Sequence, residues 1–385
     1  PGQFDSFGTP FEGHAFFEAS SMRKVGDTYY FIYSSEQEHE LCYATSLYPD
    51  RDFKYGGVII SNGDIGLEGR PSEGRLHATG NNHGSIVQIK NDWYIFYHRP
   101  TRRNLFSRQG CAEKILIKSD GTIPQVEMTS CGLNGGPLVA KGIYPAAICS
   151  SLTNGSMPHI KSQGEFTGFP AITGDERDKF IEGVDSKTIV GYKYFNFDLG
   201  KGTRDKDIMA VNLIPKGKDG TIKIMLDRPW ERDGGTEIGS IEISATDDPE
   251  GVLKTAEIDS LSSIEGKHAL YFVFKSSGSS VLCDLSSFQF GDSTVTDEDE
   301  GQDVKPEESP APDETPLPTP TPVPGNTVSP SPAVPSPTVP PAANQSEASL
   351  AVGKVHTIGN FTYKITKADT YGKGTVLLVG TKNKK

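Results

Sequence analysis

The chain has 385 residues, of which 35% are hydrophobic and 23% charged, which suits a globular protein of two or three domains. No apolar run approaches the ~20 residues that a membrane-spanning helix needs, and the net charge of −12 argues against a nucleic-acid-binding surface. The stretch from Asp297 to Glu314 carries nine acidic residues and one lysine, so the acidity belongs to one segment. The five cysteines show no C-x-x-C spacing, which predicts isolated thiols rather than a zinc site or a disulfide framework.

Before residue 293 the sequence predicts β-strands throughout, because short aromatic and β-branched runs alternate with Gly, Asn and Asp turns. Residues 23–35 (RKVGDTYYFIYSS) and residues 87–99 (VQIKNDWYIFYHR) align without gaps at an offset of 64. Each copy predicts a hairpin followed by two more strands, the last at residues 122–128, so propeller blades are favoured over two unrelated hairpins. Propellers need about four to eight blades. Residues 1–147 would thus be the last blades of a ring that begins upstream.

The stretch from residue 155 to residue 292 has no copy of this repeat. It shows short alternating strands with Gly-rich turns, the pattern of a jelly-roll-like β-sandwich. Residues 293–350 are acidic and then rich in Pro, Thr and Ser, with 14 of the chain's 27 prolines, which predicts a disordered linker; a proline-motif ligand is the alternative. Residues 351–385 predict two or three more strands, the start of a further β-rich domain. The expected fold class is therefore all-β, with a partial two-blade propeller, a sandwich, a linker and a short β fragment.

Two polar residues take related places in the repeat. Glu18 lies opposite Asn82 in the alignment, and Ala19 lies opposite His83, at the entry to the first strand of each blade. The innermost strands of a propeller line its central channel, so we expect Glu18 and His83 to converge there. Apolar neighbours disfavour the ionised form of a carboxyl group, and a protonated Glu is what a general acid for a glycosidic oxygen requires. A surface glutamate and a turn histidine remain the simpler alternatives.

Three segments in this order, HAFFEASSMRKVGDTYYFIYSS, NNHGSIVQIKNDWYIFYHR and SRQGCAEKILIKSDGTI, resemble glycoside hydrolase family 43, the five-bladed propellers of arabinofuranosidases, β-xylosidases and arabinanases. The resemblance implies inverting hydrolysis with Glu18 as general acid, His83 at the pocket floor, beside a metal or water, and Arg108 facing the substrate. It implies no required cofactor, and calcium in the propeller or the sandwich as an option. The family's two Asp residues have no counterpart before Glu18, so we expect the base upstream and this chain to be inactive alone.

The predicted sandwich is similar to carbohydrate-binding module family 6 in the segments VGYKYFNFDLG, IKIMLD, GSIEI and ALYFVFKSSGSSVLCDLSSFQF. This similarity implies that Tyr192 and Asp284 contact sugar, with Trp230 as a substitute for a missing second aromatic platform. Gln163 and Ser286 stand at the family's calcium-ligand positions, which disfavours calcium there. A structural sandwich without a sugar site is the alternative.

Together these features predict a glycosidase that acts on arabinose- or xylose-containing hemicellulose and carries an appended carbohydrate-binding module. We expect a secreted or cell-surface bacterial protein, attached to the surface through further C-terminal modules, with no nucleic-acid partner and no membrane span. Two other functions stay open: a non-catalytic carbohydrate-binding protein, and a structural surface protein whose β modules act as spacers.

Overall fold

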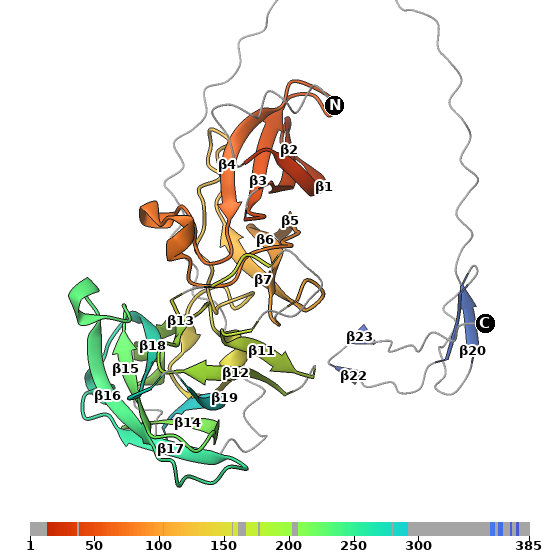
Figure 1. The fold of residues 1–385 in the computed structure, drawn as a ribbon. Coiled ribbons are helices and arrows are strands. Elements are labelled where there is room, and N and C mark those ends of the chain that lie inside the picture. The colour runs from red at the N-terminus through yellow and green to blue at the C-terminus, as the bar shows by residue number, and fades with distance from the viewer. Residues whose placement is uncertain are drawn as a thin grey trace, which may run out of the picture. The chain divides into compact units, whose positions relative to one another are not determined.

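The computed structural model describes residues 14–291 and four short strands near the C-terminus, in two compact units, residues 1–304 and residues 305–385 (Figure 1). Gaps in the first range are residues 37, 103, 156, 161–166, 176–177, 202–206 and 279. The predicted all-β class is confirmed: in the described parts the α-helix α1 (Phe197–Gly200) is one turn long, and the 3-10 helices are Leu67–Gly69, Ser72–Gly74, Ala146–Ile148, Glu231–Asp233 and Leu261–Ser263. None of the described helices has the length and apolar character to cross a bilayer.

Two antiparallel sheets form the N-terminal part. The first has the order β1 (Phe16–Val25), β2 (Thr28–Ser35), β3 (Leu41–Ser46), β4 (Lys54–Ile60), and the second has β5 (Ser85–Ile89), β6 (Asp92–Pro100), β7 (Arg108–Ile115). Their registers confirm the repeat. Arg23 lies opposite Tyr30 in the first hairpin, and Val87 lies opposite Tyr94 in the second, 64 residues further on in both strands. These sheets are the two predicted blades.

The fourth strand predicted for the second blade, at residues 122–128, is wrong. The backbone N–H of Val126 donates to the carbonyl oxygen of Ile59 in β4, at 2.8 Å, so this segment runs beside the first blade. Pro124 interrupts the run, and because proline has no N–H it cannot take part fully in a strand ladder.

The two blades meet through their first strands. Ser21 Oγ of β1 donates to Ser85 Oγ of β5 at 2.9 Å, and Arg23 Nε donates to the carbonyl oxygen of Ile86 at 3.0 Å. Tyrosine and isoleucine side chains from both blades share one buried core; its members include Tyr30, Ile32, Tyr43, Ile59, Ile86, Ile95 and Tyr97. The N-terminal ends of β1 and β5 are thereby held close together.

The sandwich consists of two six-stranded sheets (Figure 1). One has the order β10 (Ser151–Thr153), β13 (Ile189–Asn196), β18 (Lys267–Lys275), β15 (Gly220–Leu226), β16 (Thr236–Ile243), with β8 (Leu138–Val139) added beside β13. The other has the order β11 (Ala171–Gly174), β12 (Lys179–Asp185), β19 (Val281–Phe290), β14 (Ile208–Pro215), β17 (Val252–Glu257), with β9 (Gly142–Pro145) added beside β19. Fully buried aromatic rings fill the space between them, among them Tyr192, Phe195, Phe272, Phe288 and Phe290.

The sandwich therefore takes strands from residue 138 onward, which corrects the predicted boundary between residues 147 and 155. Leu138 and Val139 pair with β13, and Gly142–Pro145 pairs with β19. Strands of two to four residues carry too little hydrophobic alternation to be recognised in the sequence. All five cysteines are free thiols, as predicted.

The C-terminal unit shows two short hairpins. One pairs β20 (Val355–Ile358) with β21 (Phe361–Lys364), and the other pairs β22 (Thr370–Tyr371) with β23 (Thr375–Val376). The predicted strands of residues 351–385 are therefore present in part. The predicted linker, residues 293–350, lies outside the described residues.

Candidate functional site

Glu18 and His83 meet across the two blades. Glu18 Oε1 lies 2.9 Å from His83 Nε2, and the side chains are 42% and 34% exposed, so a ligand can reach both. Glu18 sits at an irregularity of β1, where the register against β2 shifts and Ala19 adopts a left-handed φ of 58°. Such bulges turn a side chain away from the regular strand direction and occur often beside active sites. The predicted convergence of these two residues is confirmed.

A second histidine lies behind His83. The backbone N–H of His83 donates to His98 Nε2 at 3.2 Å, and the two rings are 5.1 Å apart. Burial, followed by the charges of His83 and Arg108, lowers the pKa of His98 to about 4, so this imidazole is neutral and accepts the hydrogen bond. Arg108 itself is exposed at the start of β7, where its Nε donates to the carbonyl oxygen of Leu105 at 3.1 Å. Its predicted contact with substrate stays a prediction.

His39, which no sequence pattern singled out, lies near Glu18 and His83. Its ring stacks on Phe17 at 4.9 Å, and its Nδ1 accepts a hydrogen bond from the backbone N–H of Asn81 at 2.6 Å. Burial lowers the pKa of His39, with the nearby His159 as the next cause. A neutral His39 with Nδ1 engaged carries its proton on Nε2, the atom left to donate outward.

Glu38, next to His39 in sequence, is the centre of a group of hydrogen-bonded side chains. This group includes His159, which lies between two strands of the sandwich. Glu38 Oε2 accepts from Thr79 Oγ1 at 2.5 Å and lies 3.1 Å from His159 Nδ1, and Ser72 Oγ donates to Glu38 Oε1. Burial alone would raise the pKa of Glu38, but the hydrogen bonds from His159, Ser72 and Thr79 and the charge of Arg75 lower it to about 2. The residue is therefore an anion that fixes the turn before β3.

The backbone around this group is strained. Of the nine described non-glycine residues with positive φ, four surround Glu18 and His83: Ala19, Glu38, His39 and Asn81. Each such conformation costs about 1–3 kcal/mol and persists only where the surrounding contacts enforce it. Their concentration here supports a functional role for this part of the blades.

Two of the three predicted sugar-binding residues are structural, which corrects the prediction. Tyr192 is fully buried, its ring is 4.4 Å from that of Phe288, and its hydroxyl donates to the carbonyl oxygen of Ala146 at 3.1 Å. Asp284 is also buried; it pairs with Lys216 Nζ at 2.6 Å and accepts from the backbone N–H of Gly183 at 2.9 Å. Neither side chain is available to a sugar, because each is buried and engaged by protein partners.

Trp230, the third predicted residue, is partly exposed. It packs beside Met225 and Tyr271, while Lys275 Nζ lies 4.6 Å and the Arg232 guanidinium 5.4 Å from the centre of its ring. Its role as a platform for sugar stays a prediction.

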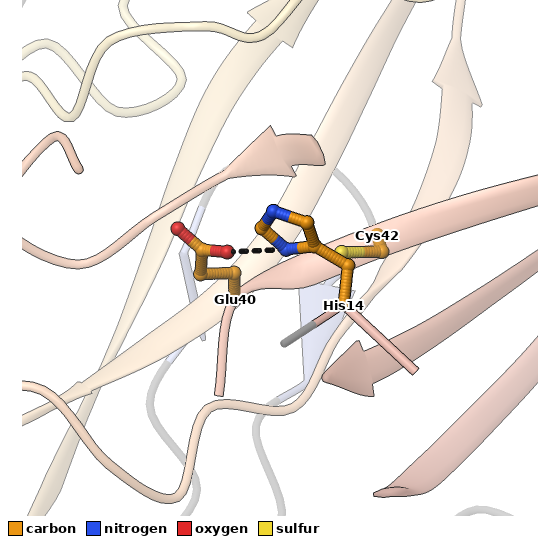
Figure 2. Close-up of side chains that lie close together, drawn as sticks. All are labelled: His14, Glu40 and Cys42. Atoms are coloured by element: carbon orange, nitrogen blue, oxygen red, sulfur yellow. Dashed lines mark ion pairs between the residues drawn. The ribbon is translucent and has the colours of Figure 1, made fainter. Parts of the chain in front are cut away.

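Three possible metal ligands gather on the first blade: His14, Glu40 and Cys42 (Figure 2). His14 Nδ1 lies 2.9 Å from Glu40 Oε2, and the hydrogen bond to Glu40 raises the pKa of His14 against the opposing effect of burial. Burial raises the pKa of the Cys42 thiol, so the sulfur is protonated. A thiol and an imidazole do not suit calcium, which takes six to eight oxygen ligands. The trio therefore does not suit calcium, and calcium in the propeller or the sandwich stays a prediction.

The chain was compared with known protein families, sequences and structures. No family profile matches it. A xylosidase/arabinosidase of Thermoclostridium stercorarium is 44% identical over 292 residues, which cover 73% of this chain and 58% of that protein. An arabinoxylan arabinofuranohydrolase of Paenibacillus polymyxa is 25% identical over 304 residues, covering 73% of this chain and 43% of that protein.

Among solved structures, a glycoside hydrolase family 43 arabinoxylan arabinofuranohydrolase from Bacillus subtilis, in complex with cellotetraose, matches with a TM-score of 0.38 and 20% identity, covering 72% of this chain and 54% of that one. The chain thus spans between 43% and 58% of the length of these relatives. Over most of its length the chain is thus similar to enzymes named xylosidase/arabinosidase and arabinoxylan arabinofuranohydrolase, in line with its sequence resemblance to glycoside hydrolase family 43.

Proposed function

We propose that the chain is part of an inverting glycosidase for arabinose- or xylose-containing plant polysaccharides, in which Glu18 is the general acid. The observation that carries this proposal is the contact of 2.9 Å between Glu18 and His83, which joins two blades at a site open to solvent. The names of the relatives, xylosidase/arabinosidase and arabinoxylan arabinofuranohydrolase, support the substrate class.

The geometry assigns a task to each atom. His83 holds Glu18 Oε1, which leaves Oε2 to face the substrate. Protonated Glu18 would give its proton to the glycosidic oxygen as the bond from that oxygen to the anomeric carbon breaks. Water would attack the same carbon from the opposite face, and its proton would pass to a second carboxylate about 6.5–9.5 Å from the acid.

We further propose that this second carboxylate belongs to another blade of the complete protein, and that the 385-residue chain alone is inactive. The working enzyme would need no cofactor. We place the protein outside the cell or on its surface, where hemicellulose is found, held there by further C-terminal modules.

The test compares this chain with a longer protein that includes upstream blades, on aryl arabinofuranosides, aryl xylosides and arabinoxylan. In the longer protein, Glu18→Gln should lower turnover by about 10²–10⁴-fold on the polysaccharide, whose leaving group needs a proton, and should spare activated aryl substrates. His83→Ala should slow both reactions. The matched controls are Glu250→Gln and His268→Ala, which lie in the sandwich. Full activity of Glu18→Gln on every substrate would remove Glu18 from the acid's role.

A further inference from the structure

The propeller blades and the sandwich enclose a hollow of about 420 Å³ that lies apart from Glu18 and His83. Its walls come from both parts of the first unit. The propeller side contributes Arg70, Leu76 and Glu127; the sandwich side contributes Ser151, Ile189, Lys193, Arg228, Pro229, Trp230, Asp233 and Tyr271. We call this space the interdomain hollow.

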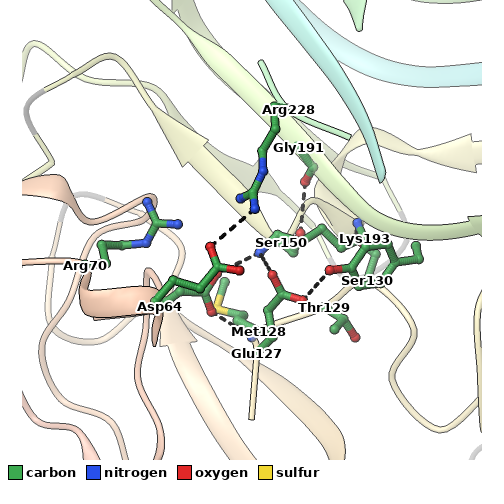
Figure 3. A network of polar contacts seen from close by, with 12 residues as sticks. Asp64, Arg70, Glu127, Met128, Thr129, Ser130, Ser150, Gly191, Lys193 and Arg228 are labelled. Carbon is green, nitrogen blue, oxygen red and sulfur yellow. Dashed lines mark hydrogen bonds and ion pairs between the residues drawn. The ribbon is translucent and has the colours of Figure 1, made fainter. Parts of the chain in front are cut away.

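A buried ionic group holds the two walls in place (Figure 3). Lys193 of β13 reaches into the propeller part, where its Nζ lies 2.7 Å from Asp64 Oδ2 and 2.7 Å from Glu127 Oε1. The side chains of Lys193 and Asp64 are only 3% and 2% exposed. The backbone N–H of Ser130 also donates to the carbonyl oxygen of Lys193 at 2.5 Å. The hollow is therefore a preformed space with fixed walls, as ligand sites usually are.

One wall offers an aromatic surface. Trp230 lines the interdomain hollow and also a smaller hollow of about 260 Å³ on the sandwich. Lys275 and Arg232 line that smaller hollow and lie over the indole ring, so they cover the ring on that side. Trp230 and Tyr271 both line the interdomain hollow and give its sandwich wall an aromatic surface.

The hollow also offers charged hydrogen-bonding groups from both walls. Lys193 contacts the carboxylates of Asp64 and Glu127, and Arg228 Nη2 lies 3.3 Å from Glu68 Oε2. Arg70 differs from these. Its Nε is buried and has no hydrogen-bond partner among the described residues. Because Arg70 lines the hollow, its guanidinium can donate to a hydroxyl-bearing ligand there.

We propose that the interdomain hollow binds a xylose-containing oligosaccharide, with Trp230 as the platform and Arg70 as a hydrogen-bond donor from the facing wall. A pyranose ring has an apolar face that suits an indole and an edge of hydroxyl groups that suits carboxylate and guanidinium partners. Because Lys193 and Arg228 already have carboxylate partners, the hollow favours a neutral sugar over an anion. The choice of xylose rests on the proposed function; the binding itself does not require catalysis.

The experiment titrates xylotetraose into the 385-residue chain by isothermal titration calorimetry, with circular dichroism to verify folding. Trp230→Ala should weaken binding about tenfold or more, and Arg70→Ala about five- to tenfold, from the loss of one aromatic contact and of one charged hydrogen bond. Arg51→Ala, an exposed arginine of the first blade, is the matched control and should bind normally. If Trp230→Ala fails to fold, Trp230→Phe keeps an apolar ring with a smaller face and should bind several-fold more weakly.

Three results would overturn the proposal: no binding by the unchanged chain, normal binding by both variants, or weakened binding by the Trp230 variant alone. The last result would place the sugar on the sandwich without the propeller wall. Glu18→Gln and His83→Ala should bind xylotetraose normally. An inactive longer protein that still binds through Arg70 and Trp230 would contradict the proposed function and leave the hollow as a sugar site.

Discussion

Two of the close pairs that join a carboxylate to a nitrogen base across distant segments differ in their exposure to solvent. Glu18 and His83 are 2.9 Å apart and partly exposed. Asp64 and Lys193 are 2.7 Å apart and almost fully buried, with Glu127 as a second acid. Lys193 is held between two carboxylates, whereas Glu18 contacts His83 through Oε1 and its Oε2 has no hydrogen bond to the described residues. Exposure and unused hydrogen-bonding capacity therefore separate the candidate catalytic pair from the structural one, although the side chains are chemically alike.

The largest effect should come from breaking the buried pair. Lys193→Ala leaves the buried Asp64 without its cationic partner, and removing one partner of a buried pair costs about 3–5 kcal/mol. Urea denaturation monitored by tryptophan fluorescence should show this loss. Lys201→Ala, which breaks an exposed pair with Glu265 at 2.6 Å, should cost about 1 kcal/mol or less. Equal losses in the two variants would contradict the distinction drawn here.

Glu113 extends the comparison, because it is a buried acid with neutral partners. It accepts from Tyr97, from the Thr129 backbone at 2.6 Å and from the Thr129 hydroxyl at 2.6 Å. Burial nonetheless raises its pKa from 4.5 to about 7. The folded state therefore binds the proton more tightly than the unfolded state. Because of this residue, the free energy of unfolding should fall between about pH 4.5 and pH 7, by on the order of 3 kcal/mol.

Glu113→Gln should remove this pH dependence and should be the more stable protein above pH 7. Urea midpoints measured at pH 4.5, 6 and 7.5 check the prediction, with Glu250→Gln as an exposed control. Parallel curves for the Glu113 variant and the unchanged protein would show that Glu113 has an ordinary pKa.

The smallest expected effect concerns His159, which lies between two sandwich strands and contacts Glu38 beside the site of Glu18 and His83. His159→Ala removes a hydrogen bond to Glu38 and should cost about 1 kcal/mol. The pKa of Glu38 should then rise from about 2 toward its ordinary value, which carboxyl-carbon NMR can follow. The contribution of Glu38 to stability is present above about pH 4.5 and is lost as the pH falls toward 2. His268→Ala, which breaks a pair with Asp227, should leave Glu38 unchanged.

The repeat explains why part of the site could be predicted. An offset of 64 residues places Glu18 and His83 at the same end of equivalent strands, and adjacent first strands bring equivalent ends together. His39 and His159 had no such signal. They meet through contacts that span 120 residues, between a turn of the first blade and a segment inside the sandwich. A pattern within one strand carries no information about contacts of this kind.

In the sandwich, by contrast, the sequence pattern led to wrong predictions. Tyr192 and Asp284 lie in strands whose residues are buried on both faces. Hydrophobic alternation in the sequence therefore cannot distinguish side chains that face the core from those that face outward. The strands between residues 138 and 153 were missed because each is too short to show a period. Aromatic strands with clear turns, such as β2 and β6, were located well because both signals coincide there.

The bridge between Thr79 and His159 affects how this protein is divided into exchangeable parts. The backbone N–H of Ile160 donates to the carbonyl oxygen of Thr79 at 2.8 Å, and a side chain at Gly80 would come within 2.5 Å of the carbonyl oxygen of Ile160. The segment with His159 and Ile160, which lies between two sandwich strands, is thus hydrogen-bonded to the blade that carries His83. Recombination that replaced the sandwich at residue 138 would also delete His159 from the polar group around Glu38. Recombination therefore preserves the complete site only when the blades and the sandwich are exchanged together.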